Sequence, residues 1–398
     1  MSDIRPSWAY SLPAALLLMA PFDILASLAM DIYLPVVPSM PGILNTTPAV
    51  IQLTLSLYMI MLGLGQVVFG PLSDRIGRRP VLLSGAVLFA VASLGAALSW
   101  GAPIFVLCRL LQAIGASAAL VATFATVRDV YGNRPEQAII YATFGSILSF
   151  VPAFGPIAGA MIADRFGWRA IFMVLAMLTL LASIHAVVKW HETCPEGAPG
   201  PRRSIWPIFK SRSFWTYTLA FSAGMGTFFV FFSTAPRVLI GRAGYSELGF
   251  SIAFATVAVV MIITARFARL FVERWGVAGC AARGMGLLLI GAAALGLGQL
   301  YGMPSFASFV LPMRIMAVGI VFAGSVTANG ALAEFGDIAG SAVAFYFCIQ
   351  SLIVSLIGTL AVTALDGDSA WPLVGFATLM ALLVLAALHL LRRHNALA

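Results

Sequence analysis

The sequence predicts an all-α membrane protein of twelve transmembrane helices in two related halves. The chain has 398 residues, of which 61% are hydrophobic and only 10% are charged, and its mean hydropathy is +0.99. A soluble domain is nearer one half apolar and one quarter charged. The apolar residues are gathered in long runs, and short patterns recur about half a chain length apart. These features indicate a protein that crosses a lipid bilayer many times.

Twelve apolar runs are each long enough to cross the hydrocarbon core, which needs about 20 helical residues. Their uninterrupted apolar character excludes an outer-membrane barrel, whose strands are short and alternate polar with apolar residues. The run that begins at Leu12 is too long for a cleavable signal peptide. The expected spans are 12–37, 48–72, 80–99, 103–126, 138–162, 168–189, 214–240, 248–270, 278–299, 305–330, 338–364 and 370–391.

One long polar segment divides the chain. Residues 191–212 contain several prolines, glycines and basic residues, a composition typical of a linker. The sequence therefore predicts an N-terminal six-helix bundle at 1–190, a cytoplasmic linker at 191–212 and a C-terminal six-helix bundle at 213–398.

The basic residues predict the orientation. With the N-terminus inside, most Lys and Arg fall in loops on the cytoplasmic side, and only Arg165, Arg169, Arg237 and Arg242 fall on the other. This asymmetry predicts a multi-pass protein of the bacterial inner membrane with both termini in the cytoplasm. The isoelectric point near 9.7 therefore reflects loops that face membrane lipid, and no nucleic-acid partner is expected. We expect a monomer.

Motifs of other function classes are missing from the sequence. The four cysteines, Cys108, Cys194, Cys280 and Cys348, form no CxxC or Cys/His cluster, so neither a disulfide nor a metal site is expected. No HExxH, GxSxG or GxxxxGK[ST] occurs. The absence of these motifs argues against an intramembrane enzyme and against an ATP-driven pump. We expect no catalytic residue and no cofactor.

Two short patterns repeat weakly between the halves. The D-R-I-G at 74–77 recurs as E-R-W-G at 273–276, and an arginine followed by a glycine at 109–115 is loosely repeated at 314–319. Internal duplication of this kind is how many transporters build two bundles around a central site.

A densely charged hinge, G-P-L-S-D-R-I-G-R-R-P at 70–80, joins the second and third runs. We expect a tight turn at the membrane surface, where glycines let helix ends approach and Asp74 accepts free N–H groups at a helix N-terminus. The arginines would face anionic lipid or an acidic residue of a neighbouring helix. The residues expected to form a conformational latch are Gly70, Asp74, Arg75, Gly77, Arg78 and Arg79. This loop closely resembles the signature between helices 2 and 3 of major facilitator superfamily transporters.

Three charged residues inside the apolar runs are the candidates for coupling. A charge within the bilayer costs at least about 2.5–3.5 kcal/mol, so it marks function by default. Asp23 and Asp31 are eight residues apart and can border one cavity at two depths. Arg109 matches Asp31 in depth, and we expect the two to interact directly or through water. Moving a cation relative to a carboxylate in low dielectric can bind or release a proton. Gln112 lies one turn from Arg109.

Small residues and prolines mark the fifth run. Glycines four apart form a small-residue face, and two prolines bend the helix. This pattern predicts a close seam that seals a cavity on one side and blocks leak. The residues are Gly145, Pro152, Gly155, Pro156 and Gly159.

An aromatic cluster is the candidate ligand pocket, because aromatic side chains pack well against a flat apolar ligand. Each ring alone is more often part of a core or a lipid-facing surface, and only the cluster carries weight. Its members are Tyr58, Phe228, Phe229, Phe231, Phe232, Phe345 and Tyr346.

Further motifs resemble the drug/proton antiporter branch of the same superfamily. R-x-x-Q-x-x-G at 109–115 and G-P-x-x-G at 155–159 resemble its second and third signatures. D-I-Y-L-P at 31–35 together with D-I-A-G-S-A at 337–342 is similar to the Bcr/CflA subfamily. The early part of the chain is also similar to bacterial chloramphenicol and florfenicol exporters. Ala113 departs from the glycine that many members have at this position.

The resemblance covers essentially the whole chain. It implies two pseudo-symmetric six-helix bundles, a central cavity and proton-coupled export of phenicol-like drugs by alternating access. The proton gradient would drive transport without any cofactor, and the partners would be a small-molecule drug, protons and lipid. A transporter of the same fold for another small apolar or amphipathic cargo remains the alternative.

Overall fold

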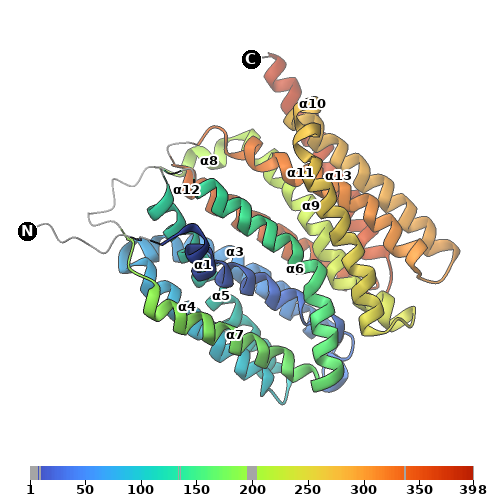
Figure 1. Ribbon diagram of the computed structural model, residues 1–398. Helices are drawn as coiled ribbons and strands as arrows, with labels where there is room; N and C mark the ends of the chain where they lie inside the picture. Colours follow the sequence, from blue (N-terminus) through green and yellow to red (C-terminus); the bar gives the residue numbers. More distant parts are fainter. Residues whose placement is uncertain are drawn as a thin grey trace, which may run out of the picture.

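A computed structural model describes residues 8, 10–132, 134, 136–194, 204–335 and 338–397. The described secondary structure is helical throughout, and the long helices lie side by side in two bundles (Figure 1). Asp337, quoted above for its family resemblance, and linker residues 195–203 lie outside the described residues.

Eight helical segments form the first bundle, and the short ones cover the link between α1 and α3. They are α1 (Leu12–Asp31), the 3₁₀-helix η1 (Leu34–Val36), α2 (Met40–Ile43), α3 (Pro48–Ile76), α4 (Arg78–Ala97), α5 (Ala102–Tyr131), α6 (Glu136–Phe166) and α7 (Trp168–Lys189).

The second bundle contains two short π-helices beside its long helices. The short helix α8 (Trp206–Lys210) precedes it, and its segments are α9 (Arg212–Pro236), η2 (Arg237–Arg242), α10 (Glu247–Tyr301), η3 (Phe306–Val310), α11 (Leu311–Leu332), α12 (Ala339–Ala364) and α13 (Trp371–Leu397). The twelve expected spans coincide with the long helices, so the predicted fold class is confirmed. The expected linker contains α8.

Glycines with positive φ make sharp turns between antiparallel helices, and two of them lie at the repeated sequence patterns. Gly77 ends α3 with φ 104°, and Gly276 interrupts α10 with φ 65° and ψ 175°. These backbone angles lie outside helical space and favour glycine. The continuous α10 is therefore two membrane helices, which brings eleven long apolar helices among the described residues to twelve spans. The repeated sequence patterns at 74–77 and 273–276 thus end in turns of the same kind.

Glycine pairs bring neighbouring helices into close contact at equivalent places in the two bundles. A Cβ atom on Gly115 of α5 would lie 2.5 Å from the carbonyl oxygen of Gly85 in α4. A Cβ atom on Gly319 of α11 would lie 2.6 Å from the carbonyl oxygen of Gly284 in α10. Without a strong hydrophobic force between helices in lipid, such close packing is what holds them together. The two bundles therefore share packing as well as sequence.

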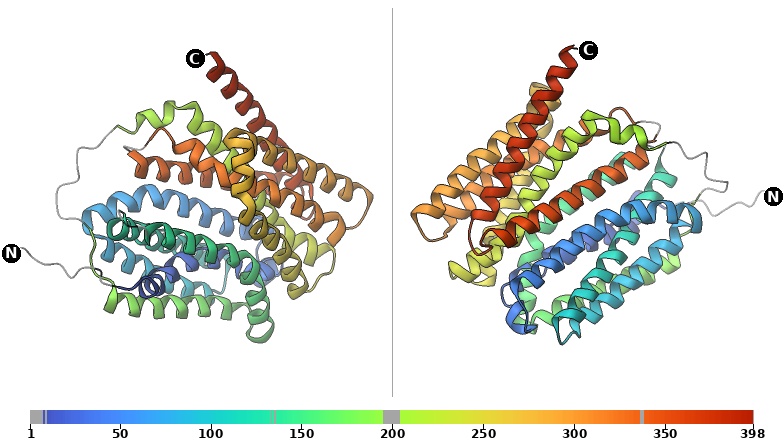
Figure 2. Two further views of the ribbon diagram at one scale, coloured as in Figure 1. Left: turned by 45° about the horizontal axis from the view of Figure 1, so that its top comes forward. Right: turned by 180° about the vertical axis from the view of Figure 1, so that it is seen from behind.

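The bundles meet along two helix pairs, α3 with α12 and α6 with α10 (Figure 2). We call the face with the Gly77 turn the hinge face and the opposite face, where α3 and α5 begin, the far face. Among the described residues, side-chain hydrogen bonds between the bundles lie toward the far face. They join Gln52 to Ser233, Ser56 to Thr359 and Ser251 to the carbonyl of Pro156. This conformation is thus closed between the bundles at the far face.

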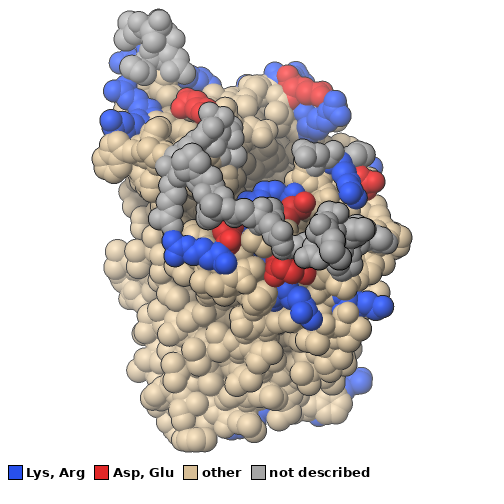
Figure 3. All heavy atoms as spheres, turned by 90° about the vertical axis from the view of Figure 1, so that its left-hand side faces the viewer, with Lys and Arg blue, Asp and Glu red and all other residues tan. Residues whose placement is uncertain are grey.

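Charged side chains gather on the hinge face, and the surface below it in this view carries few of them (Figure 3). Large hydrophobic side chains such as Leu180, Leu360 and Leu390 are exposed around the bundles. An apolar belt below a charged rim is the surface expected of a protein embedded in a bilayer.

Candidate functional site

Arg109 is fully buried inside the first bundle, where α5 crosses the end of α1. Its Nη1 donates to the carbonyl oxygen of Ala29 at 3.0 Å and to the side-chain oxygen of Gln112. Gln112 donates in turn to Ser93 at 2.7 Å. The last carbonyl groups of a helix lack partners within it, and they form the negative end of the helix dipole. The guanidinium is therefore bound by a backbone carbonyl group at the end of α1 and not by a carboxylate.

Two tyrosine rings enclose the same guanidinium. The Arg109 Cζ atom lies 4.8 Å from the ring centre of Tyr33 and 4.6 Å from that of Tyr58. Tyr58 donates to the carbonyl of Ala26, and Tyr33 shares a 2.6 Å hydrogen bond with Thr54. The Nε and Nη2 atoms of Arg109 have no hydrogen-bond partner among the described residues. The site thus holds a cation that has unused donors.

Both candidate aspartates are buried in α1, Asp23 at 4% and Asp31 at 6% exposure. Neither makes a hydrogen bond or ion pair with another described residue. The direct contact expected between Asp31 and Arg109 is absent, because the guanidinium is taken up by Ala29 and Gln112. A contact through water stays a prediction. Protonation of a buried carboxyl group that has no partner removes the free-energy cost of burying its charge.

The glycine seam of α6 packs directly against the end of α1. A Cβ atom on Gly155 would lie 2.9 Å from Cβ of Asp31, and one on Gly159 would lie 1.7 Å from the carbonyl oxygen of Ile32. Pro156 contacts the second bundle through its carbonyl, which accepts from Ser251 at 3.1 Å. The α6 seam thus touches both the buried aspartate and the opposite bundle.

Gly145 does not belong to this seam. A Cβ atom at this position would meet nothing within 4 Å, so its grouping with Gly155 and Gly159 was wrong. The position lies about three helical turns from Gly155, nearer the hinge face, where α6 is not pressed against α1. Pro152, inside α6, is half-buried.

The aromatic residues expected to form one drug pocket are divided among separate places. Phe231 is fully buried in the core of the second bundle, where it stacks on Phe254 and Phe309 with ring centres 5.2 and 5.8 Å apart. Phe228 and Phe232 also contact Phe254. These side chains fill the bundle because α9 is buried on most of its surface.

The other rings lie elsewhere. Phe229 of α9 packs near Gly358 of α12, and Tyr346 donates to Thr327 at 3.0 Å. Phe345 packs against Phe209 of α8 at the hinge face. Tyr58 belongs to the arginine site in the first bundle. The prediction of a single aromatic pocket was therefore wrong in this conformation.

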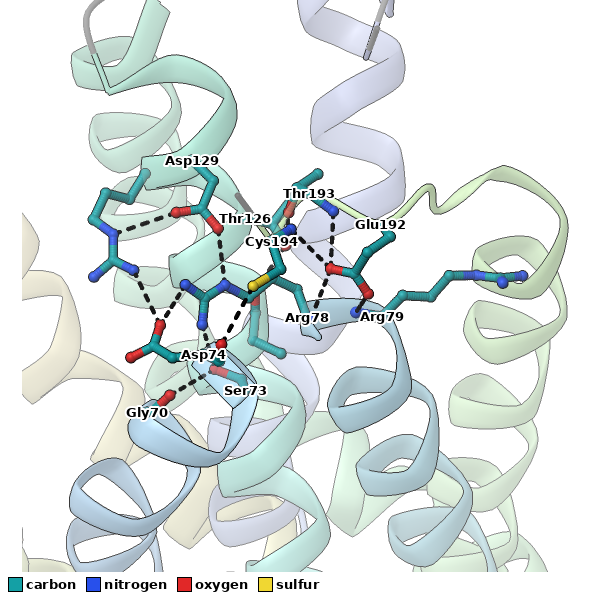
Figure 4. Close-up of polar contacts among 12 residues, drawn as sticks. Gly70, Ser73, Asp74, Arg78, Arg79, Thr126, Asp129, Glu192, Thr193 and Cys194 are labelled. Atoms are coloured by element: carbon teal, nitrogen blue, oxygen red, sulfur yellow. Dashed lines mark hydrogen bonds and ion pairs between the residues drawn. The ribbon is translucent and has the colours of Figure 1, made fainter. Parts of the chain in front are cut away.

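The hinge forms a second polar centre, shown in Figure 4. Arg78 is buried and contacts Asp74 at 2.5 Å, Asp129 of α5 at 2.8 Å and Ser73 at 2.7 Å. Arg128 approaches Asp74 at 3.8 Å. A buried guanidinium needs several charged or polar partners, and here α3 and α5 supply them. Asp129 was missed from the sequence, although it follows Arg128 at the end of a span.

The N-terminus of α4 is capped by Glu192 and not, as expected, by Asp74. The carboxylate of Glu192 accepts from the backbone N–H groups of Arg78 at 2.8 Å and Arg79 at 3.1 Å. Burial alone raises the pKa of Glu192, but the backbone N–H groups of Cys194, Arg78, Arg79 and Thr193 together lower it below the usual value of a glutamate. Asp74 is unavailable because it pairs with Arg78.

The turn itself is tighter than expected. Helix α3 continues through Pro71 to Ile76, so the turn is confined to Gly77. A Cβ atom on Gly77 would collide with the Glu192 carboxylate, whereas one on Gly70 would meet nothing within 4 Å. The expected role of Gly70 in a close approach of helix ends is therefore wrong. Arg79 donates to the carbonyl of Val187 at 2.7 Å, and Arg75, in the last turn of α3, is exposed.

Comparison with known proteins agrees with this geometry. The family model described as Major Facilitator Superfamily matches residues 23–359. A chloramphenicol resistance protein of Pseudomonas aeruginosa is 48% identical over 387 residues, which cover 97% of this chain and 92% of that protein. The multidrug resistance protein MdtL of Shewanella oneidensis is 27% identical over 346 residues, covering 84% and 86% of the two chains.

Solved structures share the fold at low sequence identity. A D-xylose–proton symporter aligns with a TM-score of 0.76 and 17% identity, covering 94% of this chain and 97% of that chain. A peptide transporter, POT, solved with sulfate, aligns with a TM-score of 0.77 and 12% identity over 94% of each chain. Two six-helix bundles, the matching family model and the 48% identical relative lead to one conclusion. The chain is a transporter, not an enzyme, and it belongs to the Major Facilitator Superfamily.

Proposed function

We propose that this transporter expels small amphipathic antibiotics of the chloramphenicol and florfenicol type in exchange for protons. The name of the 48% identical relative supports the substrate class. The multidrug resistance relatives support efflux of drugs more broadly. The observation that carries proton coupling is the pair of buried aspartates, which lack partners although Arg109 lies close to the end of their helix.

The proposed cycle assigns roles to the two polar centres. Asp23 and Asp31 take up and release protons, and Arg109 with Gln112 sets how easily they do so. The α6 seam keeps the proton path separate from the outer surface. The hinge cluster of Asp74, Arg78 and their neighbours holds the bundles together in the opposite conformation, which is closed at the hinge face.

The proposed orientation places the hinge face and both termini in the cytoplasm of a bacterial cell, with the protein in the inner membrane. The basic residues of the hinge face support this placement. The proposed boundaries of the bundles and linker are 1–190, 191–212 and 213–398, and the working unit is a monomer. Bundle contacts within each half support this division.

The driving force is adequate for such a pump. A potential of about 150 mV acting on one charge corresponds to about 3.5 kcal/mol. This energy supports a concentration ratio of a few hundredfold for a neutral drug. A same-fold transporter for another amphipathic cargo is the second candidate, favoured by the dispersal of the expected aromatic pocket.

Accumulation of labelled chloramphenicol in cells tests the proposal. Cells that express the transporter should hold several-fold less drug than control cells, and an uncoupler should remove the difference. Proteoliposomes supply the control, because they contain no other pump. Efflux driven by ATP in proteoliposomes without an ion gradient would contradict proton coupling. Unchanged accumulation of chloramphenicol and florfenicol at matched expression would favour another cargo.

A further inference from the structure

A cavity of about 210 Å³ opens between the two bundles at the far face, and neither buried aspartate lines it. One wall comes from the link between α1 and α3 and from the start of α3. The other comes from η2 and the loop before α13. Its lining residues from the first bundle are Val37, Pro38, Pro41, Pro48, Ile51 and Gln52, and those from the second are Arg237, Gly241, Arg242 and Asp368.

The two walls differ in chemistry. The first-bundle wall is made of prolines and branched aliphatic side chains, with Gln52 at its inner edge. The second-bundle wall carries two guanidinium groups held by Asp368. The carboxylate of Asp368 lies 2.7 Å from Nε of Arg237, and the backbone carbonyl of Asp368 accepts a hydrogen bond from Arg242 at 3.3 Å. The first-bundle wall can therefore pack on an apolar ring, and the second-bundle wall can donate hydrogen bonds to oxygen atoms of a ligand.

Local backbone structure places these arginines. Residues 237–242 form the π-helix η2, a geometry that is frequent at functional sites. A Cβ atom on Gly367 would lie 2.4 Å from Nη1 of Arg237, so glycine there leaves room for the guanidinium. The second bundle is thus shaped to hold Arg237 at the cavity.

A polar gate separates this cavity from the interior of the transporter. Gln52, buried at the cavity's inner edge, donates through Nε2 to Ser233 of α9 at 3.1 Å. One turn deeper, Ser56 is hydrogen-bonded to Thr359 of α12. Each bond joins the two bundles, so opening this face requires breaking both, together with the bond from Ser251 to the carbonyl of Pro156. The cavity therefore lies directly outside the closed gate.

We propose that this cavity is an exit site that receives the drug when the gate opens toward the far face. This proposal rests on the proposed function. The site would take a neutral amphipathic molecule with an aryl ring and a terminal nitro or sulfonyl group. The ring would pack on the proline wall, and the oxygens would accept from Arg237 and Arg242. An engineered cavity of about 150 Å³ in another protein holds benzene, so a substituted ring fits this volume.

A cysteine at Gly241 tests the site, because a Cβ atom there meets nothing within 4 Å. In the purified Gly241→Cys transporter, saturating chloramphenicol should slow alkylation of this cysteine about tenfold, read by peptide mass spectrometry apart from the native cysteines. The matched control is Gly302→Cys, also unobstructed and exposed at the far face but outside the cavity. There, the drug should change the rate less than twofold. Pro48→Cys on the opposite wall is a second reporter.

The charged wall gives the decisive comparison. Arg242→Gln, added to Gly241→Cys, should reduce protection to less than twofold, since one donor group is lost. Arg242 is the better choice because it is more exposed than Arg237 and its contacts are longer. Protection that persists in this variant would point to a general conformational effect and overturn the site.

The outcomes separate the two proposals. Export of chloramphenicol without protection at position 241 would refute the exit site alone. Failure to export chloramphenicol would refute the proposed function, and the exit site with it. Equal protection by sulfate without drug would show an anion site in place of a drug site and overturn the proposal.

Discussion

At the scale of single residues, the buried arginine gains its support from backbone and aromatic groups. Arg109 donates to the carbonyl of Ala29 at the end of α1 and lies between the rings of Tyr33 and Tyr58. Such contacts stabilise a cation without fixing the charge of a neighbouring carboxyl group. Asp31, in the same last turn of α1, makes no hydrogen bond or ion pair with a described residue, and in the proposed function it is a site of proton uptake.

Neutral amides at the two aspartates test their role. Asp23→Asn and Asp31→Asn keep the shape of the side chain and remove titration, so each should abolish coupled efflux while the protein remains in the membrane. The lost driving force is about 2.3 kcal/mol per 100 mV, or roughly a fiftyfold drug gradient. Drug resistance is measured at matched expression, with glutamate variants as partial rescue. Normal resistance in both amide variants would exclude them as proton sites.

Arginine geometry is tested by Arg109→Lys, which should be nearly as damaging as Arg109→Ala. Lysine keeps the charge but lacks the planar guanidinium, which lies between two rings while its Nη1 donates to Ala29 and Gln112. We expect transport to fall about tenfold or more, as for loss of a hydrogen bond to a charged group. Uptake assays in proteoliposomes measure this. Full activity with lysine would show that charge alone suffices.

At the scale of helices, close approach is governed by glycines that meet backbone atoms. Gly159 faces the carbonyl oxygen of Ile32, and Gly155 faces Asp31. Any side chain at Gly159 must push α6 away from the end of α1, because a backbone oxygen cannot move aside as a flexible side chain can. The α6 seam is therefore sensitive in a way that hydropathy alone does not reveal.

Substitution of the seam should affect cycling more than binding. Gly159→Val should slow transport several-fold while the drug dissociation constant changes less than about threefold, since the position is crowded by backbone and not by ligand. The matched control is Gly145→Ala, where a Cβ atom is unobstructed, and it should behave like the wild type. A large rise in the dissociation constant with normal turnover would place Gly159 in the drug site.

Helix capping by the linker can be measured as stability. Glu192→Gln should destabilise the detergent-solubilised protein by about 0.5–2 kcal/mol, as for loss of an N-cap. Because the folded-state pKa of Glu192 is lowered, its contribution is full at neutral pH and is lost as pH falls through that value. The difference between variant and wild type should thus shrink in acid.

The control for Glu192 is Glu273→Gln. Glu273 pairs with Arg269 on an exposed surface at 2.7 Å, where screening by solvent leaves an ion pair little net effect on stability. Thermal unfolding should change little in this variant at any pH. An equal loss of stability in both variants would mean that general surface charge, and not the cap on α4, explains the effect.

At the scale of the whole molecule, polar contacts are distributed unequally between the two faces. Bonds between bundles lie toward the far face, whereas the hinge cluster bonds within the first bundle and to the linker. The start of α12 nevertheless lies close to this cluster, since a Cβ atom on Gly340 would be 3.8 Å from Arg128. The second bundle therefore lies beside the hinge cluster at this point.

Removing one charge from the hinge should therefore shift the balance of conformations. Asp74→Asn weakens the contacts with Arg78 and Arg128, and should reduce transport while leaving equilibrium drug binding nearly unchanged. A cysteine placed between the two bundles on the hinge face should be labelled faster than in the wild type. Wild-type transport with unaltered labelling on both faces would remove Asp74 from the conformational switch.

Composition and local pattern were sufficient for much of this architecture. Hydropathy gave the twelve spans, since crossing a bilayer depends on the apolar character of about 20 consecutive residues. The glycine turn at 77 and its repeat at 276 followed from backbone freedom that few other residues possess. The charges of α1 and α5 stood out because a charge in lipid is costly. These are properties of short segments.

Only the tertiary structure decided which partners these residues meet. Glu192 caps α4 from 114 residues away, and Arg109 bonds to a backbone carbonyl that no side-chain pattern marks. The aromatic residues of α9 lie in the core of the second bundle. The sequence does not show this, because lipid and protein core are equally apolar, and an apolar helix does not reveal which of its sides faces lipid and which faces the core. Partner choice at such positions depends on how helices pack, and packing is a property of the whole chain.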